Sequence, residues 1–280
     1  TGGKANYAVK YKNDIIIFTD VGINKLSYVG NPFVYGIQDA GTNCKAISSR
    51  SIVSSGDFLS WISENSFFTY DGIVKELKSD VHDYIFDNLQ QNTQQSTFGA
   101  HNIDYNEIWW FFPVGDVDQF SPNKYIIWNY LDNSWSIGSL NRSSWIDQGV
   151  FNNPIACDVD GYVYEHDKRA LFNSPGIGSR KPFCITGPLE ISNGDRVAQV
   201  NQILPDEETT TLPGVTLNFS GKFTPLGATT DFGSFTFESD GYIDARFSAR
   251  QVQMKVEGSL TQDFQVGNIR LDVKARGRRW

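Results

Sequence analysis

Residues 106–147 read NEIWWFFPVGDVDQFSPNKYIIWNYLDNSWSIGSLNRSSWID and hold five of the seven Trp residues of this 280-residue chain. Turn-forming residues separate three apolar runs within this stretch, at residues 107–113, 124–130 and 134–139. Short β-type runs joined by turns predict a meander of antiparallel strands. A buried aromatic ring removes about 150–250 Å² from water, so we predict that these rings form a packing layer. The alternative is an exposed aromatic platform for sugars or nucleic-acid bases.

Composition limits the classes of protein that the chain can belong to. A hydrophobic fraction of 40% and an aromatic fraction of 14% exclude a disordered protein. The net charge of −8 excludes a surface that is basic throughout, and binding to the DNA backbone needs clustered Lys and Arg. The dense basic cluster lies at the end of the chain and consists of Arg270, Lys274, Arg276, Arg278 and Arg279. An excess of negative charge instead suits a surface past which DNA moves without sticking.

Cysteine usage and the chain start add two further expectations. Cys44, Cys157 and Cys184 are far apart and odd in number, which predicts reduced thiols and assembly in a cytoplasm. No apolar run approaches the roughly 20 residues that span a membrane. The chain begins with Thr1 instead of Met, which we interpret as a cut into a longer chain.

Hairpin signals recur along the first part of the chain. Short β-type runs fill residues 6–35 and 45–79, and Asp71-Gly72 is a strong hairpin turn. The segment around this turn resembles residues 157–165 (CDVDGYVYE) and, more loosely, residues 18–24 (FTDVGIN). Recurring hairpins among short strands are typical of the blades of a β-propeller.

One helix is expected at residues 80–92. Val81, Tyr84, Ile85 and Leu89 recur at helical spacing, and Ser79 or Asp80 is a suitable cap for its first turn. We interpret it as a decoration packed on a sheet edge, with a binding helix as the alternative. Residues 90–96 are polar and are expected to form a loop.

The chain is expected to contain two domains, residues 1–181 and 182–280. Residues 167–181 are rich in Gly, Ser and charge, which places the boundary near Lys181. Seven strand candidates follow, at residues 183–187, 197–204, 215–223, 233–237, 243–248, 251–257 and 266–273. They predict a β-sandwich or a flattened barrel. The overall prediction is an all-β chain: a partial β-propeller-like array of antiparallel blades, then a β-sandwich-like domain.

Charged side chains of the second domain are expected on polar faces. Arg250, Lys255 and Arg270 would lie there or pair with Asp244 and Asp272.

Sequence motifs for catalysis and cofactor binding are missing from the chain. His82, His101 and His166 do not form an HExxH or HxH pattern. No GxSxG nucleophile motif and no phosphate-binding GxGxxG or GxxxxGKS motif occurs, and residues 176–179 are interpreted as a flexible loop. We therefore predict no catalytic, cofactor-binding or metal-binding residues, and no enzyme.

Three groups of carboxylates remain as alternatives. Asp158, Asp160 and Glu165 partly match a calcium loop, but Gly161 follows the second Asp at once, so we favour a turn. Asp116 and Asp118 could hold an ion or a sugar. Glu107, beside Trp109 and Trp110, is the best candidate acid for glycoside hydrolysis, which needs a second carboxylate that the sequence does not identify.

Several segments together resemble a known family. They are residues 107–113 (EIWWFFP), 124–130 (KYIIWNY), 135–138 (WSIG), 153–156 (NPIA), 160–166 (DGYVYEH), 195–196 (DR), 204–207 (LPDE), 240–252 (DGYIDARFSARQV) and 266–273 (VGNIRLDV). This pattern of aromatics and turns resembles tail structural proteins of short-tailed bacteriophages and related prophages. The nearest kind is the tail tubular protein B, or nozzle, a β-propeller protein with added β-domains. Such proteins are considerably longer, and the missing portion would precede Thr1.

The resemblance implies a structural protein of the virion tail with no enzymatic activity. It implies a homohexameric ring below the portal and adaptor, near the tail fibres, with a channel for genome ejection. Double-stranded DNA would pass this channel without specific binding, and an acidic lumen would suit that passage. Residues 276–280 and 116–123 are the expected interface segments. The alternatives are a carbohydrate-binding or glycan-cleaving propeller that contacts a host glycan, and a general protein-binding propeller scaffold.

Overall fold

The computed structural model describes residues 3–89, 91–115, 121–167, 181–192, 196–206, 209, 215–237, 241–258 and 265–277. The chain divides into two compact units, Thr1–Lys168 and Arg169–Trp280. Every strand pair in both units is antiparallel, which confirms the all-β prediction. Within the described residues, no helix combines the length and apolar character that crossing a membrane requires.

The first unit consists of successive meander sheets, which we call blades 1 to 4, and within each the strand order follows the chain. Blade 1 contains β1 (Ala5–Tyr11), β2 (Asp14–Thr19), β3 (Gly22–Tyr28) and β4 (Tyr35–Thr42). Blade 2 contains β5 (Val53–Ser54), β6 (Leu59–Ile62), β7 (Phe67–Tyr70) and β8 (Val74–Leu77). Blade 3 contains β9 (Phe98–Asn102), β10 (Glu107–Phe112), β11 (Lys124–Asn129) and β12 (Ser134–Ser139). Blade 4 contains β13 (Ser144–Ile146), β14 (Ile155–Cys157) and β15 (Val163–Glu165). This arrangement is the predicted partial, propeller-like array.

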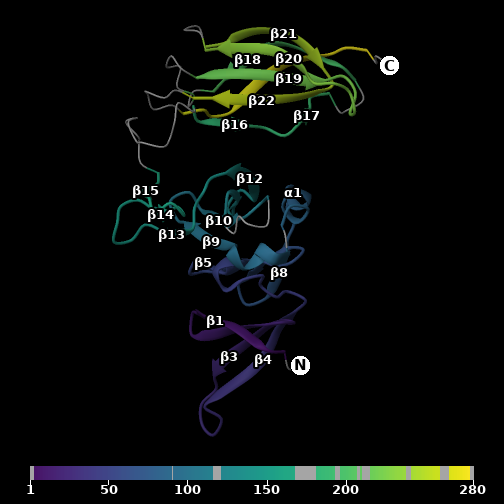
Figure 1. Ribbon diagram of the computed structural model, residues 1–280. Helices are drawn as coiled ribbons and strands as arrows, with labels where there is room; N and C mark the ends of the chain where they lie inside the picture. Colours follow the sequence, from purple (N-terminus) through teal and green to yellow (C-terminus); the bar gives the residue numbers. More distant parts are fainter. Residues whose placement is uncertain are drawn as a thin grey trace. The chain divides into compact units, whose positions relative to one another are not determined.

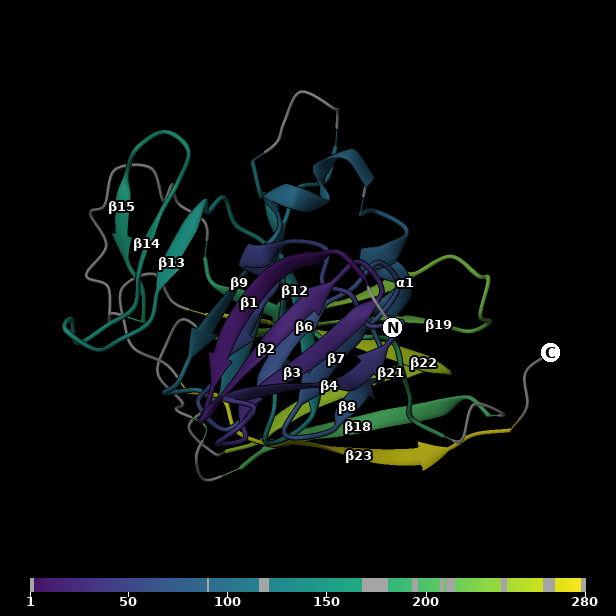
Figure 2. The ribbon, with the colours of Figure 1, turned by 90° about the horizontal axis from the view of Figure 1, so that it is seen from below.

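A buried aromatic layer joins each blade to the next. Phe18 and Trp61 meet edge to face between blades 1 and 2, with ring centres 5.1 Å apart. Figures 1 and 2 draw the strands of these two blades. Phe67 and Trp110 meet between blades 2 and 3, also at 5.1 Å. Blades 3 and 4 share a further layer, which contains Phe111 and Trp145. Burial of these rings is the main force that stacks the blades.

Strand β10 shows how one run of aromatics supports two layers. Successive side chains of a strand point to opposite faces of the sheet. Trp110 therefore packs toward blade 2, whereas Trp109 stacks on Trp145 of blade 4 with ring centres 5.6 Å apart. The packing-layer prediction is confirmed for Trp110 and Trp128, which are 0% and 6% exposed, while Trp109 is only partly buried.

The helical segment differs from the prediction. Helix α1 covers only His82–Phe86, and its cap residue is Val81, which makes no side-chain capping bond. Ile85 is buried as expected, whereas Tyr84 is exposed at 36%. Residues 91–96, expected as a loop, form the 3-10 helix η2 (Gln91–Ser96), and a short 3-10 turn, η1 (Ser49–Ser51), precedes β5.

The second unit is a sandwich of two sheets. One sheet has the order β16-β22-β19-β20 with β17 also paired to β22, and the other has the order β21-β18-β23. The strands are β16 (Phe183–Ile185), β17 (Leu189–Glu190), β18 (Ala198–Pro205), β19 (Thr216–Lys222), β20 (Thr230–Thr236), β21 (Ile243–Ala249), β22 (Gln251–Glu257) and β23 (Ile269–Ala275). Phe219 and Phe247 meet between the sheets with ring centres 5.2 Å apart. The sandwich prediction is confirmed, and β17 is the strand that the sequence did not indicate.

Candidate functional site

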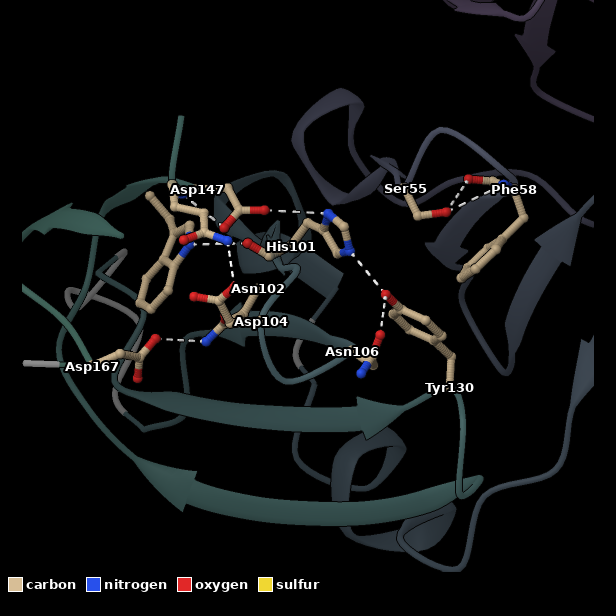
Figure 3. A network of polar contacts seen from close by, with 11 residues as sticks. Ser55, Phe58, His101, Asn102, Asp104, Asn106, Tyr130, Asp147 and Asp167 are labelled. Atoms are coloured by element: carbon tan, nitrogen blue, oxygen red, sulfur yellow. Dashed lines mark hydrogen bonds and ion pairs between the residues drawn. The ribbon is translucent and has the colours of Figure 1, made fainter. Parts of the chain in front are cut away.

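A network of polar side chains lies where β9 ends and β10 begins. The Nδ1 atom of His101 lies 3.3 Å from the Oδ2 atom of Asp147, and its Nε2 atom lies 3.4 Å from the hydroxyl of Tyr130 (Figure 3). That hydroxyl donates to Oδ1 of Asn106 at 3.2 Å. Burial lowers the pKa of His101, although Asp147 opposes this shift. The imidazole is therefore neutral at pH 7, and the network is a polar tie between blade 3 and the segment after β13.

A second part of the network holds carboxylates. Nδ2 of Asn102 donates to Oδ2 of Asp167 at 2.7 Å, and Gln148 donates to the carboxylate of Asp104 (Figure 3). Burial raises the pKa of Asp167, and the charges of Asp104 and Asp147 raise it further. The Oδ1 atom of Asn102 is buried and has no hydrogen-bond partner among the described residues.

Glu107, the candidate acid, lies beside this cluster. Nε1 of Trp109 donates to Oε2 of Glu107 at 2.8 Å. Burial raises the pKa of Glu107, and the charge of Asp167 adds to the increase. Asp167 is thus a carboxylate whose charge reaches Glu107, and the sequence did not indicate it because the two residues are far apart in the chain.

Three cavities of the described residues lie away from these carboxylates. One of about 480 Å³ is lined by residues that include Asp20, Glu64 and Glu76. Another, of about 440 Å³, lies by Val150 and Phe151, and a third, of about 520 Å³, lies in the second unit. Neither Glu107 nor Asp167 lines any of these three cavities.

The calcium alternative does not fit the geometry around Asp158. Its Oδ1 accepts from the backbone N–H groups of Asp160 and Tyr162 at 3.0 and 2.9 Å, and its Oδ2 accepts from the hydroxyl of Tyr164 at 2.8 Å. Burial opposes the shift, but these hydrogen bonds hold the pKa of Asp158 below its usual value. Within the described ranges, no three His, Cys, Asp or Glu side chains converge as metal ligands. The segment is therefore a turn, with Gly161 at a φ of +88°.

A cluster that the sequence did not indicate fastens blade 4. Nε of Arg142 donates to Nε2 of His166 at 3.0 Å, and its guanidinium lies 3.9 Å from the ring centre of Tyr164. The ring centre of His166 lies 4.5 Å from that of Trp145. Burial, and then the charge of Arg142, lowers the pKa of His166 to about 4. The imidazole is neutral and accepts from the guanidinium, so this cluster is a structural tie.

The cysteines are free thiols in the structure. Cys44 is buried, and burial raises the pKa of its thiol to about 11. Cys157 is half-buried and Cys184 is exposed.

For Lys255, the expected pairing with Asp244 or Asp272 is wrong. Lys255 pairs with Glu257 at 2.8 Å. The carboxylates of Asp244 and Asp272 accept instead from Gln202 and Asn201.

The basic cluster at the end of the chain and the loops singled out in the sequence lie only partly within the described residues. Arg270 and Lys274 lie on the exposed side of β23, and Arg276 follows it, whereas Arg278 and Arg279 lie outside the described residues. Asp116, Asp118 and the loop at 176–179 also lie outside them. Asn123, at the end of the 116–123 loop, is described: its side chain accepts from the N–H of Val114 at 2.9 Å and donates to its carbonyl at 2.8 Å.

Comparisons with known proteins do not show a family. No family model matches the chain, and no curated protein matches it. One solved chain, named "Glycoside hydrolase", aligns over 92% of this chain and 81% of its own length, with 7% sequence identity and a TM-score of 0.29. A likeness at that level carries no argument about the fold or the activity of this chain.

Proposed function

We propose that this chain is a structural component of a bacteriophage tail, part of a nozzle or hub ring that forms the channel for genome ejection. One observation carries the proposal. Successive blades are joined through aromatic layers, and the polar groups between them bond to one another. Such a stack serves as a rigid scaffold. The proposal that this scaffold belongs to a phage tail rests on the resemblance of residues 107–138 and 240–273 to nozzle proteins.

The proposed partners follow from the same assignment. Copies of the chain would form the ring, with adaptor and fibre proteins as neighbours. Double-stranded DNA would pass without specific binding, because the chain carries a net charge of −8 and like charges repel. The complete particle would reside in the virion tail after assembly in the host cytoplasm.

Electron microscopy of the purified full chain tests the proposal. The expected result is a rotationally symmetric ring, sixfold by the resemblance, with a central opening. A particle that stays monomeric at every concentration would contradict it, and so would a channel wall that is basic.

A glycan-contacting propeller is the second candidate, favoured by one observation. Burial raises the pKa values of both Glu107 and Asp167, and the charge of Asp167 adds to the increase at Glu107, as a general acid requires. However, Trp109 is already covered by Tyr125 and Trp145, with ring centres 4.8 and 5.6 Å away, so its ring is not a free sugar platform. A glycan array tests this candidate: binding that Glu107→Gln abolishes would favour it over the ring.

A further inference from the structure

The hairpin of β3 and β4 ends in an exposed apolar surface. Tyr28 and Tyr35 are cross-strand partners that touch edge to face, and they are 69% and 60% exposed. Phe33, in the connection between the strands, is 76% exposed. Val29, Val34 and Ile37 are also exposed on this hairpin end, which we call the apolar tip (residues 28–37). Exposed apolar patches of this kind mark interaction sites.

The apolar tip has no charge. Residues 27–38 (SYVGNPFVYGIQ) contain no Asp, Glu, Lys or Arg, although 20% of the whole chain is charged. Nucleic acid is therefore excluded as its partner, because phosphate binding needs Lys or Arg. Two copies of an acidic chain repel each other, and that repulsion is weakest where neither surface carries charge. A second copy of this chain can therefore approach the tip.

The second unit carries a matching surface. A pocket of about 520 Å³ lies beside β16 and β22, and its lining includes Phe183, Cys184, Met254, Val256 and Ile269. No described residue of the lining is charged. This volume is in the range of pockets that hold apolar groups, about 300–1,000 Å³.

Two lysines at the rim of this pocket, Lys181 and Lys255, share the carboxylate of Glu257. Lys255 lies 5.1 Å from the ring centre of Phe183 and pairs with Glu257 at 2.8 Å. Lys255 therefore has its counter-ion in place, and Lys181 lies 3.9 Å from the same carboxylate, so an aromatic ring that enters beside Phe183 meets a paired cation.

We propose that the apolar tip of one copy inserts into this pocket of a neighbouring copy, with Phe33 as the anchor. The two surfaces are different, so the contact is heterologous, and repetition of such a contact gives a ring when the rotation closes. A single aromatic side chain in an apolar pocket is the usual form of an interface anchor. The inference rests on the self-association in the proposed function and not on the assignment to a phage tail.

A disulfide cross-link tests the contact on the full chain. In a Cys157→Ser background, Val34→Cys places a thiol beside the Phe33 anchor, opposite the native Cys184, while Cys44 is buried. Oxidised glutathione takes up the two electrons and two protons that the thiols release. We expect a ladder of covalently linked copies on non-reducing gels. Val150→Cys is the matched control, because this side chain is also exposed, at 97%, but lies away from the tip, and we expect no ladder from it.

Self-association of charge variants gives the second readout. Phe33→Asp should weaken self-association in sedimentation at least tenfold, whereas Phe33→Leu should leave it nearly unchanged. Oligomers that form normally without the cross-link, or that tolerate Phe33→Asp, would overturn the inference and leave the proposed function standing. A link within one chain, seen as a faster monomer band, would also overturn it. A wild-type protein that is monomeric throughout would overturn both.

Discussion

Single indole rings carry much of the stability of the first unit. Trp110 is fully buried between blades 2 and 3, and its Nε1 donates to the backbone carbonyl of Ser51 at 3.0 Å. Trp128 is nearly as buried, and its Nε1 donates to Asn133 at 3.1 Å. The sequence identified these rings as core because five Trp residues share one meander. The sequence did not show that Trp109 is less buried than Trp110, since the residues on both faces of this strand are apolar.

Truncation of these rings should be costly. Trp110→Ala and Trp128→Ala should each destabilise the first unit by about 3–5 kcal/mol, because a large cavity replaces a close-packed ring. Trp109→Ala, at a partly exposed position, should cost less. Denaturant unfolding followed by tryptophan fluorescence measures the differences. Equal midpoints for the wild type and Trp110→Ala would show that this ring is not a core element.

The Arg142–His166 tie predicts a pH dependence. The pKa of His166 is about 4 in the folded chain against an ordinary value of 6.5, so the unfolded chain binds more protons between these values. The contribution of this neutral imidazole is fully present above pH 6.5 and is lost as the pH falls toward 4. The loss should amount to at most about 2 kcal/mol, a figure reduced for partial exposure to solvent.

A non-titrating variant isolates this effect. His166→Gln keeps an acceptor for Arg142 but has no imidazole to protonate. Thermal melting across the same pH range should therefore fall less steeply for His166→Gln than for the wild type, since every other titrating group is common to both. Parallel curves would mean that His166 does not control this part of the pH dependence.

At the scale of elements, the positions of most strands could be predicted from the sequence, but the sheets that pack against each other could not. Alternation and turn residues are local properties, so β10, β11, β12 and β22 start where the sequence indicates. Strand β4 was missed beyond residue 35, because its pattern of exposed residues on both sides hides the alternation. Helix α1 is shorter than the apolar spacing suggested, since no side chain caps it and no basic residue follows in its last turn.

The β10–β11 connection depends on one amide side chain. Asn123 makes two hydrogen bonds to the backbone of Val114, which closes the hairpin at its far end. Asn123→Ala should destabilise the first unit by about 1–2 kcal/mol, because both backbone groups lose a partner. Asn123→Asp, which keeps only the acceptor, should cost an intermediate amount. Hydrogen exchange at the Val114 amide provides the measurement, and unchanged protection in Asn123→Ala would contradict this role.

At the scale of the whole molecule, the fold class could be predicted from the sequence, but the contacts between blades could not. Composition and hairpin spacing were sufficient for the all-β class, the blades and the sandwich. The polar network was not predictable, because Asn102 and Asp167, or His101 and Asp147, are brought together only when blade 4 packs on blade 3. The apolar tip was equally hidden, since a run of Tyr, Val and Phe predicts burial unless the end of a hairpin leaves it in solvent.

Net charge gives a prediction for the whole chain. At an ionic strength of about 0.15 M, double-stranded DNA should show no mobility shift with the purified protein, because its net charge is −8. The basic side chains of β23 are the region most able to bind a phosphate backbone. Binding of DNA that weakens steeply with added salt would contradict the proposal that DNA passes freely. It would indicate that β23 binds nucleic acid.

The central claim is that this chain is a subunit that joins copies of itself and does not transform a substrate. Single-particle electron microscopy of the full chain tests it most directly. The account predicts class averages of a symmetric ring with an open centre, with an apolar tip seated in each neighbouring copy. Isolated single copies at every concentration, with a glycan held between Glu107 and Asp167, would contradict it.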